Sequence, residues 1–196
     1  MGNREALLAG AKRCIAEKGY AHTTARDIVA ASGTNLASIG YHFGSKDALL
    51  DAAILDWFND WDDDVEAALR EQRDGAPTDR LAAFLDVVLG NTRTERALAA
   101  ASLQWVAQIE FSDRVRGELA ETYARARREF AAMLLGVGAD EVDDDTARAV
   151  GSLGLALVNG VVLQAIIDPE RAPSGRDVAA ALRAVALPAA ASARGQ

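Results

Sequence analysis

Hydrophobic positions in this chain recur every three to four residues, and no stretch keeps the strict alternation that is typical of a half-buried strand. Prolines occur only at positions 77, 169, 173 and 188, which leaves long windows without helix breakers. Capping residues and glycines divide the chain into nine expected helices, near 4–18, 24–31, 35–43, 46–73, 78–90, 94–110, 112–135, 143–168 and 174–188. The pattern therefore predicts an all-α protein.

The second and third expected helices are short, and a turn containing Gly33 joins them. In helix-turn-helix units of this layout, the second of the two helices enters the major groove of DNA. A helical wheel of residues 34–43 predicts an apolar face, packed on its own domain, formed by Leu36, Ile39, Gly40 and Phe43. It predicts an outward, DNA-reading face formed by Thr34, Ala37, Ser38, Tyr41 and His42.

Several flanking residues suit the ends of these helices. Asn35 is a good N-cap, Gly44 can end the helix, and Ser45 can cap the next helix, which begins at Lys46. Lys46 and Thr24 lie at helix N-termini, where phosphate groups bind favourably. The expected DNA-contacting residues are Thr24, Arg26, Thr34, Asn35, Ala37, Ser38, Tyr41, His42 and Lys46.

Residues 4–50 resemble the N-terminal domain of the TetR family of transcriptional regulators. The resemblance is carried by Arg4, Leu7 and Ala11, the run 16–20, Thr23-Thr24, Ile28, Ala31, Gly33 and the run 41–46. Gly40 and Thr34 depart from the residues common in that family. The resemblance implies a homodimeric, usually repressing regulator that binds a palindromic operator and responds to a small molecule. It also implies dimerisation through the last two helices, near 143–168 and 174–194, and the run 156–169 resembles the C-terminal domain of one large branch of the family.

Charge is divided unevenly along the chain. Residues 1–50 hold all three lysines and carry a net charge of +2, whereas the 196-residue chain carries −8. The acidic remainder of the chain repels DNA, so that phosphate attraction is confined to one end and DNA should bind in a defined orientation. The negative net charge argues against a protein that coats nucleic acid through a generally basic surface. We expect a DNA-binding domain at 1–47 and a helical ligand-binding and dimerisation domain at 48–196. The polar N-terminus and the single cysteine, Cys14, predict a cytoplasmic protein with a buried thiol and no disulfide framework.

Aromatic and polar side chains in the middle helices offer material for a pocket. An apolar cavity with a few polar groups is the usual form of a small-molecule site, although aromatic stripes at helical spacing are more often core. The candidate ligand-binding residues are Trp57, Trp61, Phe84, Val88, Trp105, Gln108, Tyr123, Phe130 and Asn159. The expected effector is a small, largely apolar molecule that releases the protein from DNA.

Other interpretations are weaker. The acidic positions of 60–71 match a calcium loop, but Val65 stands where the loop needs glycine, so a solvated helix face is favoured. The segment 149–167 is nearly long and apolar enough to cross a bilayer, but it lacks a positive flank, and burial between subunits is favoured. No metal, cofactor or catalytic group is expected, because no phosphate loop, nucleophile elbow or zinc cluster occurs in the sequence. A DNA-binding regulator without a ligand and, more remotely, an all-helical enzyme remain alternatives.

Overall fold

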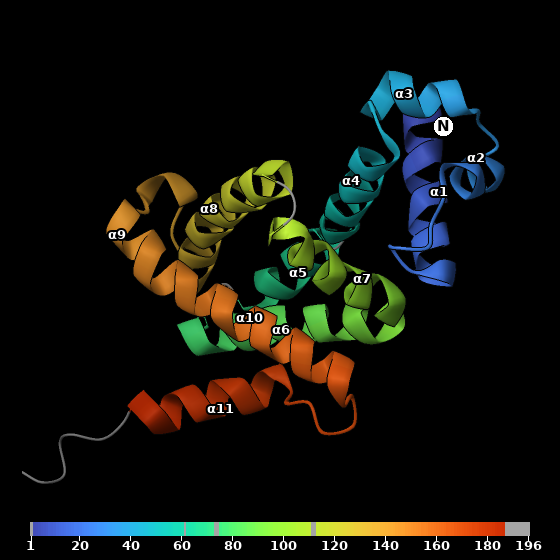
Figure 1. Ribbon diagram of the computed structural model, residues 1–196. Coiled ribbons are helices and arrows are strands. Elements are labelled where there is room, and N and C mark those ends of the chain that lie inside the picture. Colours follow the sequence, from blue (N-terminus) through green and yellow to red (C-terminus); the bar gives the residue numbers. More distant parts are fainter. Residues whose placement is uncertain (1, 61, 73–74, 111–112, 187–196) are drawn as a thin grey trace, which may run out of the picture. The chain divides into compact units, whose positions relative to one another are not determined.

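In the computed structural model, the described residues are 2–60, 62–72, 75–110 and 113–186, and they form helices and turns without a β-strand (Figure 1). The first helices are α1 (Asn3–Lys18), α2 (Ala25–Ser32), α3 (Leu36–Phe43), α4 (Lys46–Asn59) and α5 (Asp62–Glu71). They are followed by α6 (Pro77–Thr94), α7 (Arg96–Val106), α8 (Asp113–Leu135), α9 (Asp144–Thr146), α10 (Ser152–Ile167) and α11 (Gly175–Ala186). The expected all-α class is confirmed.

The chain divides into two compact units. The first unit comprises Met1–Asp62 and Asn91–Ala120, and the second comprises Asp63–Gly90 and Glu121–Gln196. In the first unit, α1 packs against α2, α3, α4 and α7, and Figure 1 shows α1–α4 together in blue to teal. The first unit therefore holds the complete predicted helix-turn-helix region together with the helix that follows it.

Local hydrogen bonds explain where the first helices begin and end. Side chains of the three N-cap residues accept backbone N–H groups three positions ahead, Thr24 from Asp27, Asn35 from Ser38 and Ser45 from Ala48. Gly33 ends α2 with φ of 67° and ψ of 21°, a left-handed conformation that glycine adopts without steric cost. These caps confirm the predicted starts of the second, third and fourth helices to within one residue.

The expected helix over 46–73 is wrong as a single element, because α4 ends at Asn59 and α5 begins at Asp62. Asparagine and aspartate have low helix propensity in a helix interior, but aspartates stabilise the first turn of a helix. Five of the six residues at 59–64 are of these two types, so the run favours a helix end followed by a new start. Among the described residues, no group of three potential metal ligands lies together.

In the second unit, α6, α8, α10 and α11 share one hydrophobic core that includes Leu85, Leu134, Val161, Ala165 and Val178. The expected helix over 143–168 consists of α9, a π-helical turn at Ala147–Gly151, and α10. Here α8 approaches so closely that a Cβ on Gly151 would lie 1.9 Å from the carbonyl oxygen of Arg127. Only glycine fits this contact between α8 and the π turn.

Candidate DNA-binding site

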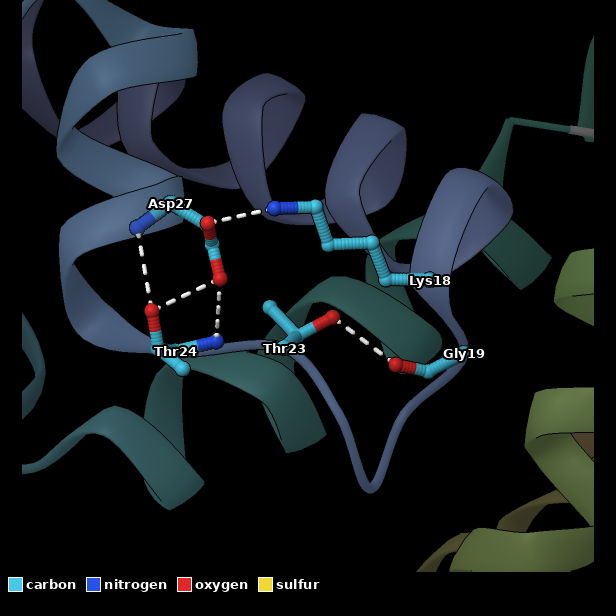
Figure 2. Close-up of polar contacts among 5 residues, drawn as sticks. All are labelled: Lys18, Gly19, Thr23, Thr24 and Asp27. Atoms are coloured by element: carbon cyan, nitrogen blue, oxygen red, sulfur yellow. Dashed lines mark hydrogen bonds and ion pairs between the residues drawn. The ribbon is translucent and has the colours of Figure 1, made fainter.

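Polar contacts between α1 and α2 hold the start of the helix-turn-helix in place (Figure 2). Thr24 Oγ1 accepts the backbone N–H of Asp27, and Asp27 Oδ2 in turn accepts the backbone N–H and hydroxyl of Thr24 at 3.0 and 2.6 Å. Lys18 Nζ at the end of α1 lies 2.5 Å from the other oxygen of this carboxylate. The hydrogen bond from Lys18, followed by those from Thr24, lowers the pKa of Asp27 to about 2.

The turn between α1 and α2 is fixed by Thr23. This side chain is buried, and its hydroxyl donates to the carbonyl oxygen of Gly19 at 2.8 Å (Figure 2). Lys46 Nζ lies 3.4 Å from the carbonyl oxygen of Thr23 and 3.0 Å from Asp47 Oδ1. The ammonium group of Lys46 therefore lies beside the turn that precedes α2, at the N-terminus of α4. A phosphate group placed here would meet that charge together with the backbone N–H groups at the start of the helix.

Exposure along α3 shows which side of the helix is available to DNA. Tyr41 is 86% exposed and Leu36 is 53% exposed, whereas Ile39 and Ser38 are buried. Ala37 and Gly40 are also exposed. The outward face of α3 is therefore formed by Leu36, Ala37, Gly40 and Tyr41, a set that we call the α3 outer face.

The predicted wheel is wrong at several positions. Leu36 and Gly40 were expected to pack inward, but both are exposed. Ser38 was expected to face outward, but it is buried, and its hydroxyl donates to Asn35 Oδ1 at 3.2 Å. His42 is half-buried, with its ring centroid 4.8 Å from that of Tyr41. A wheel gives the relative angles of the residues, and polarity was used to choose the inward side, whereas the orientation of α3 is decided by its packing on α1 and α4.

The remaining predicted DNA-contacting residues lie at or next to the starts of α2, α3 and α4. Arg26 and Thr24 are exposed at the start of α2, and Asn35 is exposed at the start of α3. Thr34 is half-buried, with its hydroxyl oxygen 2.7 Å from that of Ser32. On the inner side of the helix, the guanidinium of Arg4 lies 5.5 Å from the ring centroid of Phe43, within cation–π range. Contact of any of these residues with DNA remains a prediction.

The candidate ligand-binding residues fall into separate groups. In the first unit, Trp57 and Trp105 are each only 1% exposed, and the indole N–H of Trp57 donates to the carboxylate of Glu95. In the second unit, the rings of Phe84 and Phe130 meet edge to face with centroids 5.0 Å apart.

The other candidates for the ligand site lie in the second unit or outside the described part of the chain. Asn159 donates to the hydroxyl of Tyr123 at 3.0 Å, and Val88 is buried. Trp61 and the side chain of Gln108 lie outside what the structure describes. Two open depressions of about 290 and 310 Å³ in the second unit have none of the predicted residues in their linings. A shared ligand cavity remains a prediction.

Two family models match the chain. Residues 7–53 match the model described as bacterial regulatory proteins of the tetR family, and residues 77–187 match the C-terminal domain of the BetI-type transcriptional repressors. Together with the helix-turn-helix geometry, these matches define a DNA-binding transcriptional regulator rather than an enzyme. The chain belongs to the TetR family.

Known proteins similar to this chain are regulators of the same kind. The HTH-type transcriptional regulator BetI of Rhizobium meliloti is 29% identical over 161 residues, which cover 82% of this chain and 76% of that protein. A TetR transcription regulator from Haloarcula marismortui has a similar structure, with a TM-score of 0.66, 22% identity and 94% coverage of both chains. A transcriptional regulator from Saccharomonospora viridis, solved in complex with choline, has a TM-score of 0.63 and 23% identity, and the alignment covers 92% of this chain and 93% of that one. These two structures support the fold.

Proposed function

We propose that this regulator is a repressor that binds a near-palindromic operator as a homodimer. The observation that carries the proposal is an apolar stripe on α10, formed by Ala149 of the preceding π turn together with Leu153, Ala156, Gly160, Leu163 and Ile167. Leu153 is 51% exposed, Leu163 44% and Ile167 71%. Their alternating spacing of four and three residues is that of a helix seam that packs along a second helix.

The opposite face of α10 is already covered. Gly154 faces the ring of Phe130, and Val161 and Ala165 lie in the core of the second unit. Gly151 of the preceding π turn and Gly154 both pack closely against α8 of the same chain. The apolar stripe, with the exposed Val185 on α11, is therefore the surface left for a second copy.

A membrane is the other apolar environment that such a helix suits. The segment Asp144–Ile167 is long and apolar enough to span one, with a mean hydropathy of 2.0 in a window that is 28% buried. Aspartates stand at both of its ends, at 143–145 and 168, so that it lacks the basic flank that orients a membrane helix. The packed inner face and the relation to soluble DNA-binding regulators favour the dimer, and with it a cytoplasmic location.

We further propose that a small, largely apolar effector binds in the helical body and releases DNA. Three buried polar groups of the first unit lack a hydrogen-bond partner, namely the indole N–H of Trp105, the Thr92 hydroxyl and the side-chain amide nitrogen of Asn91. Buried polar groups are normally paired, so these would interact favourably with the polar atoms of a ligand. A structurally similar regulator from Saccharomonospora viridis was solved in complex with choline, and the multidrug binding protein EbrR in complex with imidazole. Choline and imidazole are therefore tested first, beside small apolar compounds.

The test begins with selection of DNA fragments from a random pool by the purified protein. We expect an inverted repeat whose half-sites lie about one helical turn, roughly 34 Å, apart. Selected sequences without an inverted repeat would contradict binding as a symmetric dimer. Compounds are then titrated against the complex, with tryptophan fluorescence and DNA release as the two readouts.

An effector titrated into the complex should change the fluorescence and release DNA at the same concentrations, because one binding event produces both signals. By reciprocity, bound DNA should weaken effector binding by the same factor as the effector weakens DNA binding. Trp105→Phe should reduce both responses, whereas Leu135→Ala, at an exposed position on α8, should leave them unchanged. If no compound releases DNA although specific binding is retained, the alternative of a regulator without a small-molecule ligand is favoured.

A further inference from the structure

The α3 outer face contains no charged side chain and no side-chain amide. It presents the aliphatic side chain of Leu36, the methyl group of Ala37, the bare backbone of Gly40 and the ring of Tyr41 with its hydroxyl. Leu36 and Tyr41 are more than half exposed although both are large and partly or wholly apolar. In a helix-turn-helix, this is the side of the second helix that meets the base edges in the major groove.

The chemistry of this face limits which bases it can recognise directly. Guanine is usually read by arginine or lysine, and adenine by the paired groups of an asparagine or glutamine amide. Asn35 lies next to the outer face, but its Oδ1 already accepts the backbone N–H and the hydroxyl of Ser38 at 3.0 and 3.2 Å. A bidentate contact from Asn35 to adenine would therefore compete with the N-cap of α3.

An apolar side chain in the major groove has one matching group among the four bases, the C5-methyl of thymine. Leu36 and Ala37 are adjacent in sequence and exposed in the first turn of the helix, the part that most often contacts base edges in helix-turn-helix proteins. A Cβ at Gly40, one turn further on, would meet no atom within 4 Å apart from its two neighbours and the nearby backbone of α3 itself. The missing side chain thus leaves room for the backbone to approach the bases between Leu36 and Tyr41.

We propose that α3 selects its operator half-sites mainly through thymine methyl groups, which Leu36 and Ala37 contact, with the Tyr41 hydroxyl as the single polar reader on this face. The proposal rests on the proposed binding of an operator through α3. It makes Leu36, a residue that polarity assigned to the protein interior, a specificity-determining residue.

The test uses the operator selected from random DNA and replaces each thymine in turn by uracil, which removes only the methyl group. We expect at least one thymine in each half-site at which uracil weakens binding about four-fold, the value for loss of one buried methyl-sized group. Replacement at the same position of both half-sites should weaken binding about fifteen-fold, because independent contributions multiply.

Protein variants assign the effect to the residue. We call the factor by which uracil weakens binding the uracil penalty. In Leu36→Ala, uracil at the thymine that Leu36 contacts should no longer weaken binding, whereas the conservative Leu36→Met should keep the penalty. Leu135→Ala, the same change at a leucine of similar exposure on α8, should also keep it. Circular dichroism spectra of all three variants should match that of the parent protein. If Leu36→Ala is unstable, the effect of uracil on binding by Leu36→Met still tests the contact at this position.

The results separate this proposal from the one on which it rests. Failure to select any specific DNA would refute the proposed operator binding. Specific DNA binding that is insensitive to uracil at every position would overturn only the thymine proposal, as would a uracil penalty that persists unchanged in Leu36→Ala.

Discussion

Trimming Leu163 in the middle of the α10 stripe should weaken the proposed dimer by a calculable amount. The change from leucine to alanine removes three carbon atoms, which contribute about 2.4 kcal/mol when fully buried. Leu163 is 44% exposed in the single chain, so covering it with a partner would contribute about 1 kcal/mol of the burial free energy of these three carbon atoms. In a two-fold symmetric interface each change occurs twice. The expected loss for Leu163→Ala is therefore about 2 kcal/mol, or about a thirty-fold increase in the dimer dissociation constant.

The assay is sedimentation equilibrium over a dilution series that spans the dissociation constant. Leu135→Ala is the matched control, because Leu135 is 45% exposed but lies on α8 and is not part of the α10 stripe. The control should dimerise as the parent protein does. Equal dissociation constants for the two variants would show that the α10 stripe is not the dimer interface.

Three further predictions concern other parts of the chain. Gly151→Ala places a carbon atom against the carbonyl group of Arg127 and should lower the free energy of unfolding, measured with denaturant, by about 1–3 kcal/mol. Gly117→Ala, in open space on α8, should raise it by up to about 1 kcal/mol. Lys46→Ala should weaken specific and non-specific DNA alike and reduce the salt slope of binding by about one unit; an unchanged slope would argue against a phosphate contact. Because the pKa of Asp27 is lowered to about 2, its stabilising contribution is complete above the ordinary value of 3.8 and is lost as the pH falls through about 2. A carbon-13 NMR titration should place the Asp27 pKa closer to 3.8 in Lys18→Met, and no change would contradict the ion pair.

Helix starts were predictable because a cap is a local interaction. Thr24, Asn35, Ser45 and Asp143 each accept a backbone N–H three residues ahead, so the signal and the structure lie within one helical turn. The same locality explains why Gly33 marks the end of α2. By contrast, two features of the sequence oppose each other after α4. The run of Asn and Asp residues favours a helix end, whereas the apolar periodicity around it favours a continuous helix. Periodicity alone favoured one long helix.

The orientation of α3 could not be obtained from polarity, because its most informative residues depart from the usual rule. Ser38 is buried, since Asn35 satisfies its hydroxyl locally, and Leu36 is exposed, since the helix packs through Ile39 instead. Gly151 shows a related limit. A glycine in a sequence does not show what it packs against, and only the three-dimensional arrangement identifies α8 as its neighbour.

The contacts of α4 constrain how the proposed effector response reaches the DNA-binding surface. The hydroxyl of Tyr20 donates to the buried Asp51 at 2.5 Å, and further along α4 the ammonium of Lys12 lies 2.9 Å from Asp56 and 2.6 Å from Asp60 just beyond its end. Partial burial lowers the pKa of Lys12, but the two carboxylates outweigh it and raise the pKa overall, so the ammonium stays charged at neutral pH. Bending α4 away from α1 would break these contacts and expose the side chains packed between the two helices. The proposed effector would therefore disturb less packing if α1–α4 and α7, which packs against α1 and α4, turned as one body. In the proposed dimer, that motion would change the spacing of the two α3 helices without altering either one.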